Sequence, residues 1–169
     1  MDLGPDTGSL TVKTYREGVA AKAGHDLVIA VERWSATAGD DGAVSLEADP
    51  RSLAIREGLR GVKPLTDRDR KEIRKNIDEK VLGTTPVTFN GRARRDGDRV
   101  VAEGELTMAG AARPLTVELA VDGDRVTGVA ELVQSEWGIK PYRGLMGALR
   151  VRDTVEVLID ARLPPGLAG

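Results

Sequence analysis

The sequence predicts an all-β protein that carries one surface helix. Apolar and polar residues alternate through most of the chain, and this two-residue period is typical of half-buried strands. Turns rich in Gly and Asp separate the alternating runs at short, regular intervals, which favours an antiparallel meander over βαβ units. Only residues 66–82 change to a helical period. We therefore expect about eight antiparallel strands and one lateral α-helix.

Seven alternating runs are the clearest strands. In each run, every second side chain faces the same side of the sheet. The same-face sets are Leu10, Val12 and Thr14; Leu27, Ile29 and Val31; Val44, Leu46 and Ala48; Val100, Ala102, Leu106 and Met108; Leu115, Val117, Leu119 and Val121; Val126, Ala130 and Leu132; and Val155, Val157, Ile159 and Ala161. Turns are expected at 39–42, 96–98, 109–112 and 122–124.

The helical segment has one narrow apolar stripe, formed by Ile73, Ile77 and Val81. Thr66 or Asp67 can cap its start, and Gly83 can end it. Its other faces are charged, with pairs at i,i+4 spacing such as Arg74 with Asp78. Such a helix lies on a surface, either over a sheet or across the end of a barrel.

Composition excludes several classes of protein. The chain has 169 residues, a net charge of −2, one histidine, five aromatic residues and no cysteine. Disulfide frameworks, thiolate sites and multi-histidine metal sites are therefore excluded, and a nucleic-acid-binding surface is disfavoured. We expect one domain over 9–164 with loose tails at 1–8 and 165–169. The start lacks the basic and apolar regions of a secretory signal, so a cytoplasmic location is expected.

Alternation alone leaves two architectures open, a closed barrel and a two-layer sandwich. Four motifs bear on this choice, namely GHDL at 24–27 before a strand that ends at Trp34, TPVTF at 85–89, GELTMAG at 104–110 followed by RPL at 113–115, and SEWGI at 135–139. Together they resemble the YceI-like family of bacterial lipid-binding proteins, in the family's order, from about residue 9 to 164. The resemblance implies a lipocalin-like antiparallel β-barrel whose lumen holds a long isoprenoid chain, such as a polyprenyl or quinone tail.

The function expected from this resemblance is noncatalytic binding of an amphiphilic, isoprenoid-like lipid in the lumen. The expected partner is a hydrophobic small molecule, without nucleic acid, metal or cofactor other than such a lipid. An alternative is a barrel filled by its own side chains that docks a protein partner. A third hypothesis, a hydrolase or isomerase that uses His25, has little support because the sequence contains no nucleophile elbow.

Ten residues are the candidate ligand contacts: His25, Leu27, Ile29, Trp34, Phe89, Leu106, Met108, Trp137, Tyr142 and Met146. His25 has two interpretations, a contact for a polar head group or a structural histidine that bonds the backbone, and the second is favoured. Trp137 either lines the cavity or plugs one barrel end, and the plug is favoured.

Two segments outside this set also have two interpretations. Residues 140–152 form either a mobile flap over an opening or a long hairpin packed on the barrel. The basic excess over 51–80 is either a rim for a pyrophosphate or an anionic membrane surface, or a solvated helix, and the helix is favoured.

Overall fold

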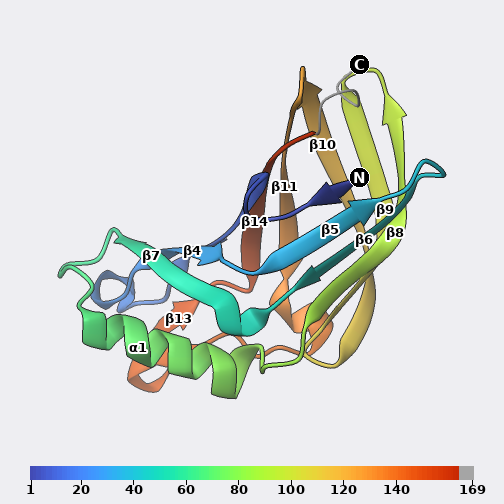
Figure 1. Ribbon diagram of the computed structural model, residues 1–169. Helices are drawn as coiled ribbons and strands as arrows, with labels where there is room; N and C mark the ends of the chain where they lie inside the picture. Colours follow the sequence, from blue (N-terminus) through green and yellow to red (C-terminus); the bar gives the residue numbers. More distant parts are fainter. Residues whose placement is uncertain (164–169) are drawn as a thin grey trace.

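The computed structural model describes residues 1–163, and most of them belong to one curled antiparallel sheet (Figure 1). Eleven strands hydrogen-bond in the order β1-β5-β6-β8-β9-β10-β11-β14-β2-β4-β7. Their bounds are β1 Asp2–Leu3, β2 Gly8–Thr14, β4 Asp26–Val31, β5 Trp34–Ala38, β6 Ala43–Ala48, β7 Leu53–Leu59, β8 Val87–Asp96, β9 Arg99–Met108, β10 Ala111–Asp122, β11 Arg125–Val133 and β14 Thr154–Arg162. The predicted all-β, barrel-like class is confirmed.

The strand count differs from prediction because one long hairpin is bent. The chain runs β4-β5, turns at 39–42, and returns as β6-β7, with sharp corners between β4 and β5 and between β6 and β7. Backbone N–H groups of Glu32 and Asp49 donate to the carbonyls of Ser52 and Arg33, at 3.1 and 3.0 Å, and join the two corners. One half of the hairpin pairs with β2 and the other with β8. The bend divides the hairpin into four strands, of which β5 and β7 lie outside the seven predicted runs, and the pairing of β1 with β5 adds one more strand.

The sheet is curled but its hydrogen bonding does not close, which corrects the expectation of a closed barrel. Its two edges are β1 and β7. A β-bulge at Arg56 of β7 shifts its register against Val28 and Ile29 of β4, and a bulge of this kind bends the strand that carries it. The expected loose tail at 1–8 is also wrong, because Asp2 and Leu3 pair with Thr37 and Ala36. The tail expected at 165–169 lies outside the described residues.

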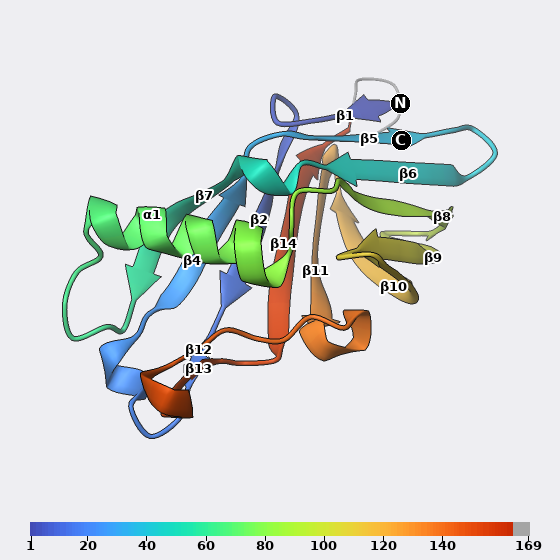
Figure 2. The ribbon, with the colours of Figure 1, turned by 90° about the horizontal axis from the view of Figure 1, so that it is seen from below.

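The predicted helix is confirmed. Helix α1 spans Asp67–Asn76 and continues as a π-helical turn over Ile77–Val81. Thr66 caps it, since its hydroxyl accepts from the Asp69 backbone N–H while the Asp69 carboxylate accepts from that of Thr66. Arg74 donates to the carbonyls of Pro50 and Arg51 and pairs with Asp78 at 3.3 Å, so it attaches the helix to the β6-β7 corner. Helix α1 packs beside β7 (Figures 1 and 2).

Residues 140–152 form a hairpin, as in the second of the two interpretations, but it belongs to a separate three-stranded sheet and not to the main sheet. Strands β12 (Arg143–Gly144) and β13 (Leu149–Val151) pair with each other, and β13 pairs with β3 (Arg16–Glu17). The N–H groups of Ala20 and Arg152 donate to the carbonyls of Ala148 and Tyr15 at 2.8 and 2.7 Å. These bonds join the hairpin to the segment that follows β2.

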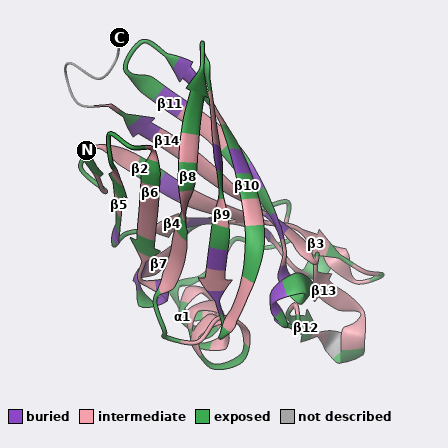
Figure 3. Ribbon diagram, turned by 90° about the vertical axis from the view of Figure 1, so that its right-hand side faces the viewer, coloured by how far each residue is buried: buried purple, intermediate pink, exposed green. Residues whose placement is uncertain are grey.

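Burial alternates along the long strands, as in β9 and β10 (Figure 3). The buried faces converge on a core cluster made by Leu106, Met108, Leu132, Trp137, Ile139 and Val155. Trp137 lies in the short 3-10 helix Gln134–Trp137, which ends at Gly138 in the left-handed region at φ 72°. This cluster packs one end of the curled sheet and leaves the space above it open.

Candidate ligand-binding cavity

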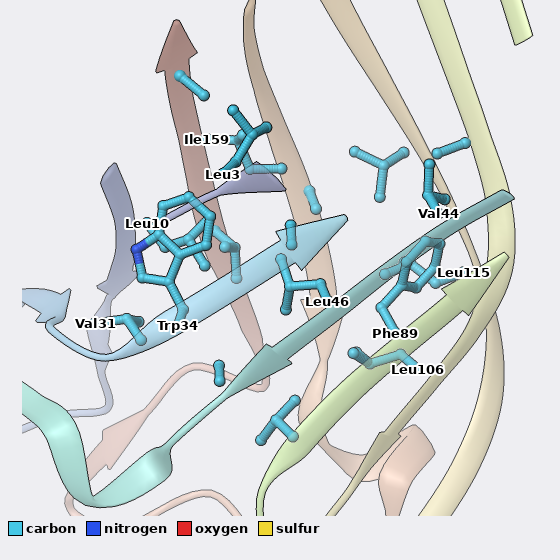
Figure 4. A pocket seen from close by; sticks show the side chains of 18 of the residues that line it. Leu3, Leu10, Val31, Trp34, Val44, Leu46, Phe89, Leu106, Leu115 and Ile159 are labelled. Atoms are coloured by element: carbon cyan, nitrogen blue, oxygen red, sulfur yellow. The ribbon is translucent and has the colours of Figure 1, made fainter. Parts of the chain in front are cut away.

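The concave face of the sheet encloses a cavity of about 780 Å³ (Figure 4). Small-molecule sites in proteins commonly have volumes of about 300–1,000 Å³. The labelled side chains in Figure 4 project from different strands toward one shared space, and every one of them except Trp34 is pure hydrocarbon. The cavity is therefore large enough for an organic ligand and offers it an oily surface.

The walls are the same-face residues of the alternating strands. All seven predicted sets contribute to the lining, and every member lines the cavity except Leu27. Two strands on either side of β11 contribute four lining residues each, Leu115, Val117, Leu119 and Val121 from β10 and Val155, Val157, Ile159 and Ala161 from β14. Alternation thus places the apolar side chains inside and the charged ones outside.

Small residues widen the lumen where β8 and β9 pair. Gly91 lies opposite Gly104, and Ala93 lies opposite Ala102. A Cβ at Gly91 would lie 2.2 Å from the carbonyl oxygen of Glu103, and one at Gly104 would lie 2.3 Å from that of Asn90. Larger residues cannot fit there without moving the strands. The two alanines, which line the cavity, leave space that a larger side chain would fill.

The turns 39–42, 96–98 and 122–124 lie together with the N-terminal residues at one end of the sheet, which we call the hairpin end. The mouth of the cavity is at this end. The exposed lining residues are Met1, Thr37, Gly39, Asp40 and Arg95, all from this end. It lies at the upper right of Figure 1, near the N-terminus. Polar and charged side chains therefore meet the lumen where water can reach them.

The opposite end of the cavity is a floor. Ile77, Val81 and Leu82, from the end of the helix, line it together with Gln134 and Ile139, and none of these residues is exposed. The Gln134 amide donates to the carbonyl of Arg152 at 3.2 Å, so its polar group is satisfied. The helix that the sequence predicts across a sheet or a barrel end thus helps to close the cavity.

Half of the predicted ligand contacts lie in the lining. The five that line the cavity are Ile29, Trp34, Phe89, Leu106 and Met108. The five that lie outside the lining are His25, Leu27, Trp137, Tyr142 and Met146. The positions missed include the β10 and β14 walls, the end of the helix and the mouth. Period-two alternation identified the β10 and β14 faces, but not that they border open space.

The two tryptophans differ in role. Trp137 is 2% exposed, belongs to the core cluster, and its indole N–H donates to the Leu106 carbonyl at 2.9 Å. Trp34 lines the cavity, and within residues 1–163 its buried indole nitrogen has no hydrogen-bond partner. The geometry of Trp137 matches the favoured plug, so it belongs to the floor and not to the wall.

His25 has the geometry of a structural residue. Its Nε2 lies 2.5 Å from the carbonyl oxygen of Lys63, and its ring packs close to Gly58 and Gly61. The neighbouring Asp26 is buried, accepts from the Arg16 backbone N–H at 2.8 Å, and lies 3.4 Å from Arg60. These contacts join three loops to one another outside the cavity.

Leu27, Tyr142 and Met146 also lie elsewhere. Leu27 precedes Ile29 on β4, beyond the last lining residue of that strand. Tyr142 is exposed beside β12, and Met146 is fully exposed at the tip of the β12-β13 hairpin, with φ 57°. The apolar composition of 140–152 suggested an opening, but the segment projects away from the lumen.

One charged group on the lining has a strongly altered titration. The Arg51 backbone N–H and the guanidinium groups of Arg33 and Arg51 bond the Asp49 carboxylate and lower its pKa to about 2. Asp49 therefore stays ionised at neutral pH and holds the β6-β7 corner. Within residues 1–163, no three His, Cys, Asp or Glu side chains are grouped as metal ligands would be. None of the helices described there is both long and apolar enough to cross a bilayer.

The fold and the cavity define a class of protein, a curled antiparallel sheet around an apolar lumen with one capping helix. A family model for the YceI-like domain matches residues 34–163. The chain belongs to the YceI-like domain family.

Solved structures share the fold at low sequence identity. BcnA of Burkholderia cenocepacia is 18% identical, with a TM-score of 0.59 over 89% of this chain and 94% of that chain. A polyisoprenoid-binding domain from Saccharophagus degradans, implicated in plant cell wall breakdown, is 10% identical, with a TM-score of 0.61 over 95% of this chain and 98% of that one. None of the curated proteins matches this sequence.

Proposed function

We propose that this protein binds an isoprenoid-like lipid in its cavity, with the apolar tail along the β10 and β14 walls and the polar group at the mouth. The observation that carries the proposal is the 780 Å³ lumen lined by aliphatic side chains. Each Å² of apolar ligand surface removed from water contributes roughly 25 cal/mol, so an oily tail gains affinity in proportion to its buried length.

The orientation follows from the two ends of the lumen. The floor is made of apolar side chains and the satisfied Gln134 amide, so a polar head group buried there would lose hydrogen bonds with water. The mouth carries Thr37, Asp40 and Arg95, and it is open to solvent. A lipid that enters tail first keeps its head group hydrated.

Family membership and the fold of the polyisoprenoid-binding domain support the same class of ligand. A noncatalytic carrier function fits the lumen, because most of its lining is aliphatic and the carboxylate of Asp49 is held in ion pairs with Arg33 and Arg51. A quinone and a polyprenyl alcohol both meet the requirements of the site.

The alternative, a filled barrel that docks a protein partner, requires a lumen packed with side chains. The small residues of β8 and β9 work against such packing, because Gly91, Ala93, Ala102 and Gly104 leave the centre of that wall without bulk. We therefore favour the lipid carrier.

Native mass spectrometry of protein purified under mild conditions, followed by organic extraction, tests the proposal. We expect a bound lipid, or stoichiometric uptake of an added prenyl alcohol or menaquinone. A preparation that contains no lipid and takes up neither compound would contradict it.

A further inference from the structure

Three loops come together at the end of the molecule opposite the mouth. We call this region the loop end and define it as residues 16–25, 58–63 and 140–150. The Val62 N–H donates to the Lys22 carbonyl at 3.3 Å, and the Ala20 N–H donates to that of Ala148 at 2.8 Å. His25 bonds the Lys63 carbonyl in the same region. In Figures 1 and 2 the three loops project from the sheet on the side away from the N-terminus.

Exposed apolar side chains gather at the loop end. The described chain has seven large apolar residues that are exposed, and five of them belong to these loops: Val19, Leu59, Val62, Tyr142 and Met146. Val19 and Met146, at 97% and 106%, have essentially no protein contact. Folded monomers rarely leave apolar side chains so clustered and exposed unless they meet a partner.

The charge of the loop end is strongly positive although the whole chain has a net charge of −2. Its ranges contain seven Lys or Arg residues, namely Arg16, Lys22, Arg60, Lys63, Lys140, Arg143 and Arg150, against the single acidic residue Glu17. Within residues 1–163, Lys22, Lys63, Lys140 and Arg143 form no ion pair. Four cations thus surround the apolar tips without an internal counter-charge.

From this arrangement we propose that the loop end docks on a bilayer that contains anionic lipids. Lysine and arginine side chains attract an anionic surface by about 1 kcal/mol each, while apolar tips insert among the head groups. The apolar residues stand on separate projecting loops, so they fit a fluid interface that closes around each tip. The geometry does not fit a rigid protein surface, which would need matching hollows.

Docking is separate from ligand binding, because none of the loop-end residues whose side chains the structure describes lines the cavity. The mouth lies at the opposite end and stays in water when the loops face the bilayer (Figure 1). This inference therefore does not rest on the proposed function. A loop-end variant is expected to change membrane binding while it takes up lipid as before.

A labelling experiment tests the proposal directly. Since the sequence has no cysteine, Met146→Cys or Val19→Cys gives one site for an environment-sensitive fluorophore. The matched control is Val129→Cys, because Val129 is an exposed apolar residue of β11 outside the loop end. Vesicles of phosphatidylcholine with phosphatidylglycerol should shift the emission of labels at 146 and 19 to the blue and leave the label at 129 unchanged.

Unlabelled variants separate charge from insertion. Lys22→Gln and Lys63→Gln should each weaken binding to these vesicles about fivefold, and high salt should weaken the wild type. The double variant Val19→Ser with Met146→Ser should weaken it at least about tenfold. Val129→Ser is the control, and circular dichroism checks that each variant is folded.

Three results would overturn the proposal: no binding of the wild type to anionic vesicles, equal binding to pure phosphatidylcholine, or an equal response of the label at 129. Loss of lipid uptake in the glutamine variants would show that the two sites are coupled and would contradict their separation.

Discussion

The floor and the mouth of the cavity are built from the same alternating strands, yet they differ in packing. At the floor, Trp137 fills the space between β9 and β14, and its N–H is satisfied by the Leu106 carbonyl. At the mouth, lining residues such as Thr37 and Arg95 are exposed and the lumen is open. The comparison teaches that one apolar face can supply stability at one end and a ligand space at the other. The two ends differ because the 3-10 helix Gln134–Trp137 inserts a large side chain, that of Trp137, at the floor only.

The largest expected effect is on the floor. Trp137→Ala should lower the free energy of unfolding by about 3–5 kcal/mol, because it leaves a hole in the core cluster and removes the indole hydrogen bond to the Leu106 carbonyl. Urea denaturation measures the loss. Trp34→Ala is the matched variant and should cost less, since Trp34 already borders open space and its N–H has no partner to lose. Equal losses would contradict the distinction between floor and wall.

A large side chain on the β8 wall of the cavity tests whether the ligand occupies the lumen. Ala93→Phe should place a ring in the lumen and weaken uptake of a prenyl alcohol at least tenfold, which corresponds to about 1.4 kcal/mol. Ala120→Phe is the control, because Ala120 is exposed on β10 between two lining residues and faces outward. Titration by native mass spectrometry compares the two. Unchanged uptake in Ala93→Phe would place the ligand elsewhere.

A smaller effect is expected at the helix that helps to close the floor. Thr66→Ala removes the hydroxyl that accepts from the Asp69 N–H and should cost about 1 kcal/mol of stability. Thr116→Ala, at an exposed position of β10, should change it by less than about 0.5 kcal/mol. If urea titration gives the same value for both, the capping box does not stabilise the helix.

The smallest effect concerns the β6-β7 corner and depends on pH. The pKa of Asp49, about 2 in the fold, lies below its ordinary value of 3.8. The ionised carboxylate therefore stabilises the fold above about pH 4, and this contribution is lost as the pH falls toward 2. Asp49→Asn should lower Tm at pH 7 and have progressively less effect between pH 4 and 2. Asp122→Asn, in a turn of the hairpin end, should not show this trend.

The sequence pattern predicted which strand faces turn inward, but it did not predict which residues border the cavity. The two-residue period placed Val157 and Leu119 on the inner face because burial on one side of a strand leaves a direct trace in composition. The helix was equally clear, since Thr66 and Gly83 mark its ends. The bend in the hairpin was harder to recognise. Its trace is a shift of one position in the alternation, since the inward residues are odd-numbered up to Val31 and even-numbered from Trp34.

Only half of the candidate contacts lie on the cavity wall, for a related reason. His25, Trp137, Tyr142 and Met146 were selected by residue type and by motif, and the residue type does not say on which side of the sheet a loop folds. Their positions follow from long-range contacts, such as the bond between His25 and the Lys63 carbonyl. Whether the five lining residues contact a ligand is a prediction that the Ala93→Phe comparison begins to address.

A crystal structure of the protein grown with a prenyl alcohol would show where the ligand lies. We expect density for an extended chain along Leu115 and Val157, with its hydroxyl near Thr37 and Arg95 at the mouth. A lumen that stays empty while the alcohol binds on the outer surface would contradict this expectation.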